Sequence, residues 1–102
     1  MSSPGNGQST PYRVSMSHQT RAVLKQLHLQ AAHAGTGHRF LAALRQILQR
    51  LRSDPLTFGE PYYRLPVLKL LIRQAVVSPL VVDYAVHEEQ PVVLIHGFKV
   101  LS

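Results

Sequence analysis

The fold is decided by residues 80–101, LVVDYAVHEEQPVVLIHGFKVL, in which two β-type runs are separated by the short polar connection 87–90. A third run of this kind, residues 66–77, precedes them across Ser78-Pro79. Connections this short join antiparallel neighbours, because a parallel crossover needs a dozen or more residues. The last third of the chain therefore predicts an antiparallel meander.

Two amphipathic helices are predicted upstream of the meander. Apolar residues recur on one face over residues 18–34 and, more regularly, over residues 37–52. Ser17 and Thr36 are candidate N-caps, and Gly35 is a candidate helix stop. The two predicted helices are therefore joined by a short turn.

A short first strand is expected over residues 12–16, where large or apolar residues alternate with polar ones. Between the second helix and the meander lie several turn-forming residues, followed by Tyr62-Tyr63-Arg64, which we expect to form a linker. The resulting order, β-α-α-β-β-β, predicts an α+β domain with two helices packed on one face of a small, mostly antiparallel sheet.

Length and composition predict one domain. The 102 residues, 45% of them hydrophobic, fit a single small core over residues 12–102, while residues 1–11, rich in Ser, Gly and Pro, are expected to form a disordered tail. The chain has no cysteine, which is compatible with a reducing compartment such as the cytoplasm. We identify no membrane span and no signal peptide, so we expect a soluble cytoplasmic protein.

Charge is distributed unevenly along the chain. The net charge is +6, and residues 1–53 contain seven arginine or lysine residues and no aspartate or glutamate. A basic half of this kind suits a polyanion or an acidic protein partner, whereas a solvated basic face that aids solubility is the alternative. The candidate contact residues are Arg39, Arg45, Arg50, Arg52 and, nearer the meander, Arg64.

Pairing Val77 with Leu80 and Val86 with Pro91 across the two turns gives a provisional register for the meander. A slip of one residue would move a whole strand to the other face. With this register one face is expected to be an exposed cationic cleft, and it carries Lys69, Arg73, Tyr84 and Lys99 together with Val82, Val93 and Ile95. The other face is expected to be the helix-facing core, and it carries Leu68, Leu70, Ile72, Val76, Val81, Leu94, His96 and Phe98.

The order of elements and two sequence patterns resemble the RelE/ParE toxin superfamily. The patterns are Leu51-Arg52-Ser53-Asp54-Pro55 at the end of the helix pair and the strand sequence of residues 80–99, whose Ile95-His96-Gly97-Phe98-Lys99 is similar to the final strand of the HigB-like branch. The resemblance covers residues 12–102. It implies a small basic toxin of a bacterial toxin–antitoxin module, often of the plasmid stabilisation type, which is neutralised by an acidic antitoxin and acts on messenger RNA at the ribosome or on DNA gyrase.

If the family's metal-free ribonuclease chemistry applies, this sequence must supply groups for a phosphate and for proton transfer. Arg73 is the candidate phosphate clamp, because a guanidinium binds phosphate oxygens bidentately, and Lys69 and Lys99 would add electrostatic stabilisation. His96 or His87 is the candidate acid or base, and Tyr84 would stack on a base or donate a proton. Each has a structural alternative: a packed core residue for His96 and Tyr84, and a paired surface cation for Arg73.

One feature favours partner binding over catalysis. Ribonucleases of the family continue past the last strand into a tail that completes their site, whereas this sequence ends at Val100-Leu101-Ser102. The six histidines lack the three- or four-residue spacing of a helical metal pair, so no metal and no cofactor are expected. Three hypotheses remain open: a ribosome-dependent ribonuclease, a toxin that binds gyrase or another protein, and an inactive relative that only binds a partner.

Overall fold

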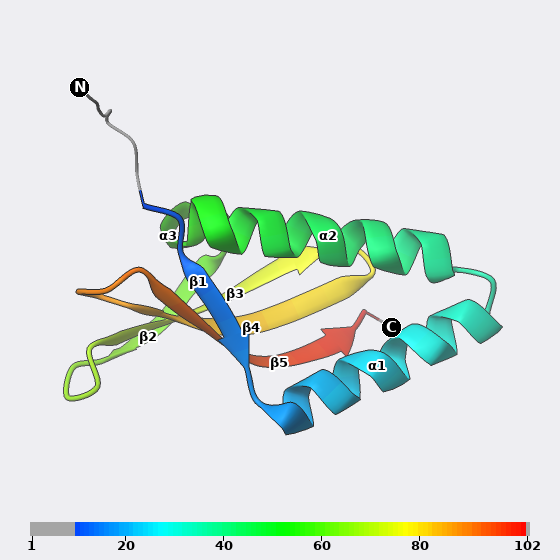
Figure 1. Ribbon diagram of the computed structural model, residues 1–102, viewed down its shortest axis with the longest axis horizontal. Coiled ribbons are helices and arrows are strands. Elements are labelled where there is room, and N and C mark those ends of the chain that lie inside the picture. Colours follow the sequence, from blue (N-terminus) through cyan, green and yellow to red (C-terminus); the bar gives the residue numbers. More distant parts are fainter. Residues whose placement is uncertain (1–9, 102) are drawn as a thin grey trace.

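The computed structural model describes residues 10–101, which form three helices and a five-stranded sheet (Figure 1). The predicted tail, residues 1–11, lies almost wholly outside the described residues. In chain order the elements are β1 (Arg13–Met16), α1 (His18–His33), α2 (Gly37–Ser53), α3 (Pro55–Phe58), β2 (Glu60–Leu65), β3 (Leu70–Val77), β4 (Leu80–His87) and β5 (Val92–Val100).

The sheet has the strand order β1-β5-β4-β3-β2. Strand β1 runs parallel to β5, and every other neighbouring pair is antiparallel. The predicted α+β class, with two main helices over a mostly antiparallel sheet, is confirmed. Two elements were not predicted: the four-residue helix α3, and strand β2, which lies where a linker was expected.

The helix boundaries follow local chemistry. The side chain of Ser17 accepts a hydrogen bond from the Thr20 amide at 3.0 Å, which confirms Ser17 as the N-cap of α1. After the end of α1, Gly35 takes the positive φ of 80° that favours glycine. Thr36 makes no side-chain cap, because its hydroxyl donates instead to the carbonyl oxygen of Ala31 at 3.1 Å.

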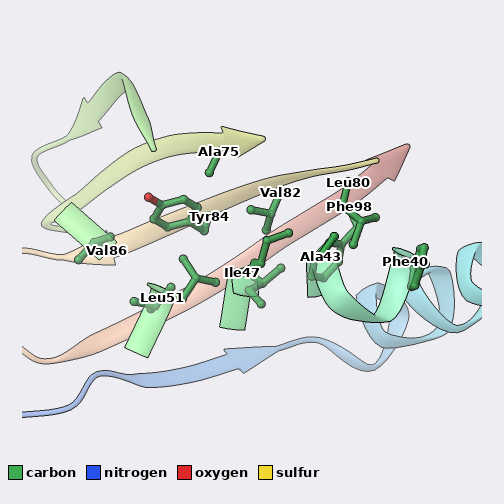
Figure 2. Close-up of a cluster of buried hydrophobic side chains, with 12 residues drawn as sticks. Phe40, Ala43, Ile47, Leu51, Ala75, Leu80, Val82, Tyr84, Val86 and Phe98 are labelled. Atoms are coloured by element: carbon green, nitrogen blue, oxygen red, sulfur yellow. The ribbon is translucent and has the colours of Figure 1, made fainter. Parts of the chain in front are cut away.

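The hydrophobic core lies between α2 and the sheet. Figure 2 shows Ile47 and Leu51 of α2 beside the central strand β4, whose Val82, Tyr84 and Val86 are also buried. Helix α2 buries one full stripe, whereas the only buried residue of α1 is Thr20, next to β5. Burial of such side chains stabilises a fold by roughly 1.5–3 kcal/mol each, so α2 contributes more packing than α1.

The predicted register is correct across the first turn and wrong across the second. Val77 lies opposite Leu80 as expected, but Val86 lies opposite Val93 and not Pro91. Beyond this point β5 contains one extra residue between Ile95 and Gly97. The bulge changes the alternation of β5, so that Ile95 and Phe98, three residues apart, both reach the core.

The predicted assignment of the two sheet faces is inverted. The helices cover the face that carries Tyr84, Val82, Val93 and Ile95, all of which are buried. The expectation of an exposed cationic cleft around Tyr84 is therefore wrong. Most of the expected core residues lie on the other face, and His96, which was expected in the core, is exposed at the bulge.

We call this second surface the helix-free face, because none of the described helices packs on it. Its central row crosses all five strands, since residues directly opposite in neighbouring strands project to the same side. The row consists of Tyr63, Ile72, Ala85, Leu94 and Ser15. Val81 is buried on this face between Val76 and Lys99, although no helix covers it.

Candidate functional site

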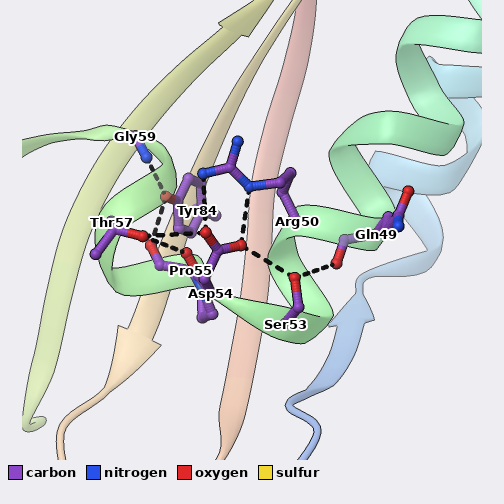
Figure 3. A network of polar contacts seen from close by, with 8 residues as sticks. All are labelled: Gln49, Arg50, Ser53, Asp54, Pro55, Thr57, Gly59 and Tyr84. Carbon is purple, nitrogen blue, oxygen red and sulfur yellow. Dashed lines mark hydrogen bonds and ion pairs between the residues drawn. The ribbon is translucent and has the colours of Figure 1, made fainter.

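Of the five candidate catalytic residues, only Arg73 and Tyr84 lie directly opposite each other in the sheet. Tyr84 is fully buried, and its hydroxyl donates to the carbonyl oxygen of Pro55 at 2.8 Å and accepts from the Gly59 amide at 2.9 Å (Figure 3). Burial raises the pKa of Tyr84, an effect that the bond from the Gly59 amide and the neighbouring positive charge of Arg73 oppose. The Tyr84 hydroxyl therefore fastens the α3 segment to the sheet and does not face solvent.

Arg73 is occupied by the same segment. One terminal nitrogen of its half-buried guanidinium donates to the carbonyl oxygen of Gly59. Its Nε is buried and has no hydrogen-bond partner in the structure. A phosphate clamp needs one edge of the guanidinium free to make two parallel hydrogen bonds. Arg73 has no such free edge in this geometry, because one nitrogen is bonded to Gly59 and its Nε is buried.

The other three candidate catalytic residues lie apart from this pair. Lys69 is in the turn before β3, with a positive φ of 56°, and its Nζ is 2.8 Å from a carboxylate oxygen of Glu89. Lys99 projects from the helix-free face opposite Val81. His96 is exposed at the β5 bulge, where its carbonyl oxygen accepts from Thr20. The five residues do not form one constellation.

Three charged side chains of the sheet, those of Arg64, Arg73 and Asp83, are bonded to partners in the same chain. Arg64, a predicted contact residue, forms a two-bond ion pair with Glu88, which lowers the pKa of that carboxyl. Asp83 accepts a hydrogen bond from the side-chain amide of Gln74 at 2.7 Å, and the two residues lie directly opposite each other in the sheet. In this part of the molecule, charge serves the fold.

Arg50, another predicted contact residue, joins α2 to α3. It makes two bonds, of 2.8 and 2.9 Å, to the carboxylate of Asp54, and its guanidinium lies 4.8 Å from the ring centroid of Phe58. The bond from Arg50 is the main reason why the pKa of Asp54 is lowered, with help from Ser53 and Thr57 (Figure 3). Arg50 is therefore bonded to Asp54, which directly precedes the segment that holds Pro55 and Gly59, the two hydrogen-bond partners of Tyr84.

The remaining predicted contact residues, Arg39, Arg45 and Arg52, are exposed on α2. None of them forms a salt bridge among the described residues. The same holds for Arg21 and Lys25 of α1, which sequence reasoning did not single out. The unpaired cations of the helices are thus the ones available to a partner.

Four of these cations lie on the sides of α1 and α2 that face each other. In α1, residues 21, 25, 28 and 32 form one row at spacings of four, three and four, and in α2 residues 41, 45, 48 and 52 do the same. The rows approach each other near the connection between the helices, where His28 stacks on Phe40 at 5.3 Å and where His28, Ala32 and Leu41 line the same surface pocket.

Figure 1 shows α1 and α2 diverging from this connection toward their other ends. Arg21 and Lys25 lie toward the divergent end of α1, whereas in α2 Arg45 lies at the middle of the helix and Arg52 near its divergent end. We call these four residues the basic helix surface. The signal that could have revealed Arg21 and Lys25 was their spacing, combined with the absence of acidic residues from residues 1–53.

No family model, curated protein or solved structure matches this chain.

Within residues 10–101 no group of three or more His, Asp or Glu side chains is placed to hold a metal ion. None of the helices in the same range is both long and apolar enough to cross a membrane. What the described surface offers a partner is positive charge on the helices and apolar area on the helix-free face.

Proposed function

We propose that this protein is a toxin-like component of a bacterial type II toxin–antitoxin module and that an acidic antitoxin neutralises it by binding the basic helix surface. The observation that carries the proposal is the charge separation: Arg21, Lys25, Arg45 and Arg52 are exposed and without salt bridges in the described chain, while residues 1–53 contain no acid. The α+β fold, in which one strand and two main helices precede the antiparallel strands, is compatible with it.

Action through protein binding agrees better with the geometry than messenger RNA cleavage. Cleavage requires a phosphate clamp and a proton-transfer group within reach of one reacting phosphate. Here Tyr84 is buried, Arg73 donates to Gly59, and Lys69 is paired with Glu89. A toxin that acts by binding a protein target, such as DNA gyrase, needs neither a phosphate clamp nor a proton-transfer group. The alternative is an inactive family relative that acts only as a protein-binding module.

The first test is inducible expression in a bacterium, with and without an acidic protein encoded beside the gene. Under the proposal, expression arrests growth and the acidic protein relieves the arrest. An absence of arrest would favour the inactive relative. If cleaved messenger RNA appears and Arg73→Ala abolishes both cleavage and arrest, the ribonuclease alternative replaces a protein target.

The second test addresses the surface itself, with polyglutamate as a defined acidic probe. Charge reversal at Arg45 and Arg52 to glutamate should weaken binding of the probe by more than about tenfold at low salt, because both cations are exposed on the same side of α2 and make no salt bridge with any described residue. The matched control reverses both Arg13 and Lys99, two exposed cations of the helix-free face, to glutamate, so that the net charge changes equally in the two variants. Equal losses in both variants would contradict a specific role of the helices.

A further inference from the structure

The helix-free face is a second surface without a described partner. Its central row contains no charged side chain, and two residues of that row are exposed: Tyr63 by 58% and Leu94 by 41%. Val76, two rows away on the same face, is 54% exposed. Tyr62, also exposed, lies on the same side, since its hydroxyl bonds to Gln74 at 2.7 Å. Contiguous apolar patches of this kind on small proteins mark interaction sites.

We propose that this face is the interface of a homodimer, in which two copies of the chain pack their sheets face to face. Such packing buries the inner faces about 10 Å apart, with the strands of the two sheets within about 30° of each other. The proposal concerns a different surface from the basic helix surface and does not rest on the proposed function.

Charge favours a second copy over other occupants. Around the apolar centre, the helix-free face carries Arg13 and Lys99 as its basic residues and Glu60 and Asp83 as its acidic residues. The face is therefore close to neutral, in a protein of net charge +6. Two copies can meet there without the like-charge repulsion that opposes contact between their helices, and the surface has no excess charge to attract a nucleic acid.

Symmetry strengthens this argument. In a dimer whose two-fold axis lies between the sheets and runs across the strands along the central row, the rows on either side of that row exchange places between the two copies. Glu60 and Asp83 belong to the row on one side of the central row, and Arg13 belongs to the row on the other side. The acidic row of each copy therefore lies over the row of its partner that carries Arg13, and this happens twice in the assembly.

The available area is of the size that a stable dimer needs. Five strands spaced about 4.8 Å apart and four residue rows about 7 Å apart give a flat footprint of roughly 24 by 25 Å. Side chains make the accessible area larger than about 600 Å² of flat surface, which approaches the roughly 800 Å² per partner of a standard interface. Val67 and Leu68, exposed at the tip of the β2–β3 hairpin, extend the apolar area.

The test is the mass of the full chain in solution by sedimentation equilibrium, from about 1 to about 200 μM. We expect the wild type to reach twice the 11.4 kDa of one chain. Leu94→Lys, in the centre of the interface, should weaken dimerisation by at least about a hundredfold, since it places two charges against an apolar surface. Leu29→Lys is the control, because Leu29 is 51% exposed on α1.

A second measurement does not depend on a disruptive variant. The chain has no cysteine, so Leu94→Cys introduces a single thiol near the centre of the proposed interface. A bifunctional thiol cross-linker that spans about 10 Å, the distance between two packed sheets, should join most chains in pairs, whereas Leu29→Cys should give few. A wild-type chain that stays monomeric overturns the proposal and leaves a different protein as the occupant. A dimer that Leu94→Lys leaves intact, or equal cross-linking of the two cysteine variants, also overturns it.

Discussion

The helices and the sheet use their charged residues in opposite ways. On the sheet side, Arg64, Lys69 and Arg73 are each bonded to a carboxylate or a carbonyl oxygen of the same chain. On the helices, Arg50 alone is paired, with Asp54, the first acidic residue of the sequence. The difference teaches that most cations available to a partner lie on the helices, since Arg13 and Lys99 are the only strand cations of the described chain whose side chains are not bonded to a carboxylate or carbonyl oxygen.

The helices and the strands β2 to β5 are connected by the segment 55–59, which consists of α3 and Gly59. Arg50 reaches it from α2, Tyr84 from β4 and Arg73 from β3. Three elements therefore converge on one short piece of backbone, so changes there are expected to cost stability. Changes on the basic helix surface are expected to cost binding and not stability.

The largest effect is expected from Gly59→Ala. A Cβ at this position would lie 2.6 Å from the carbonyl oxygen of Gln74 and 2.8 Å from the hydroxyl oxygen of Tyr84, so β3 or α3 would have to move. We expect a loss of about 3 kcal/mol in the free energy of unfolding, measured by urea denaturation. Gly97→Ala is the control, since a Cβ there meets nothing within 4 Å. Equal stability of the two variants would show that the segment is not tightly held.

Tyr84→Phe should have the next largest effect. The substitution keeps the ring in place but removes the hydroxyl that bonds to Pro55 and Gly59, leaving a carbonyl oxygen and an amide without their partner. We expect a loss of about 2 kcal/mol in the free energy of unfolding. Tyr63→Phe, at an exposed position, should change stability by less than about 0.5 kcal/mol. Similar losses in the two variants would assign the tyrosines equal roles.

The same hydroxyl predicts how stability depends on alkaline pH. Burial raises the pKa of Tyr84 above its ordinary value of 10.0, so the folded protein holds this proton more tightly than the unfolded chain does. The resulting stability is fully present below pH 10.0 and is lost as the pH rises from there toward the folded-state pKa. Thermal unfolding of Tyr84→Phe should fall less steeply with pH in this range. A slope equal to that of the wild type would mean that other groups cause it.

The sequence was sufficient to predict the order of the main elements, because helix caps and short connections are local signals. Ser17 and the turn between Val77 and Leu80 are examples in which chemistry over a few residues decides the structure. Strand β2 was missed because Pro61 interrupts it. An outer strand tolerates a proline, since one of its edges makes no ladder bonds.

The candidate site was harder to predict because both faces of the central strand are apolar. Val81 and Ala85 of β4 are as deeply buried on the helix-free face as Val82 and Val86 are against α2, so alternation does not identify the helix side. The one-residue bulge at His96 then shifts Phe98 into the core. Because both faces of β4 are apolar, Tyr84 was predicted to line an exposed cleft, although it belongs to the core. Because of the bulge in β5, His96 was predicted in the core, although it is exposed.

The smallest effect on stability is expected from the combined substitution of Arg45 and Arg52 by glutamine. Both side chains are exposed and make no salt bridge with any described residue, so the free energy of unfolding should change by less than about 0.5 kcal/mol. Arg50→Gln is the matched comparison on the same helix, and it should lower stability measurably, because it removes both bonds to Asp54 and the contact with Phe58. A large loss in the Arg45 and Arg52 variant would mean that these cations serve the fold after all. The distinction between the two halves of the molecule would then have to be abandoned, and with it the reason for placing a partner on the helices.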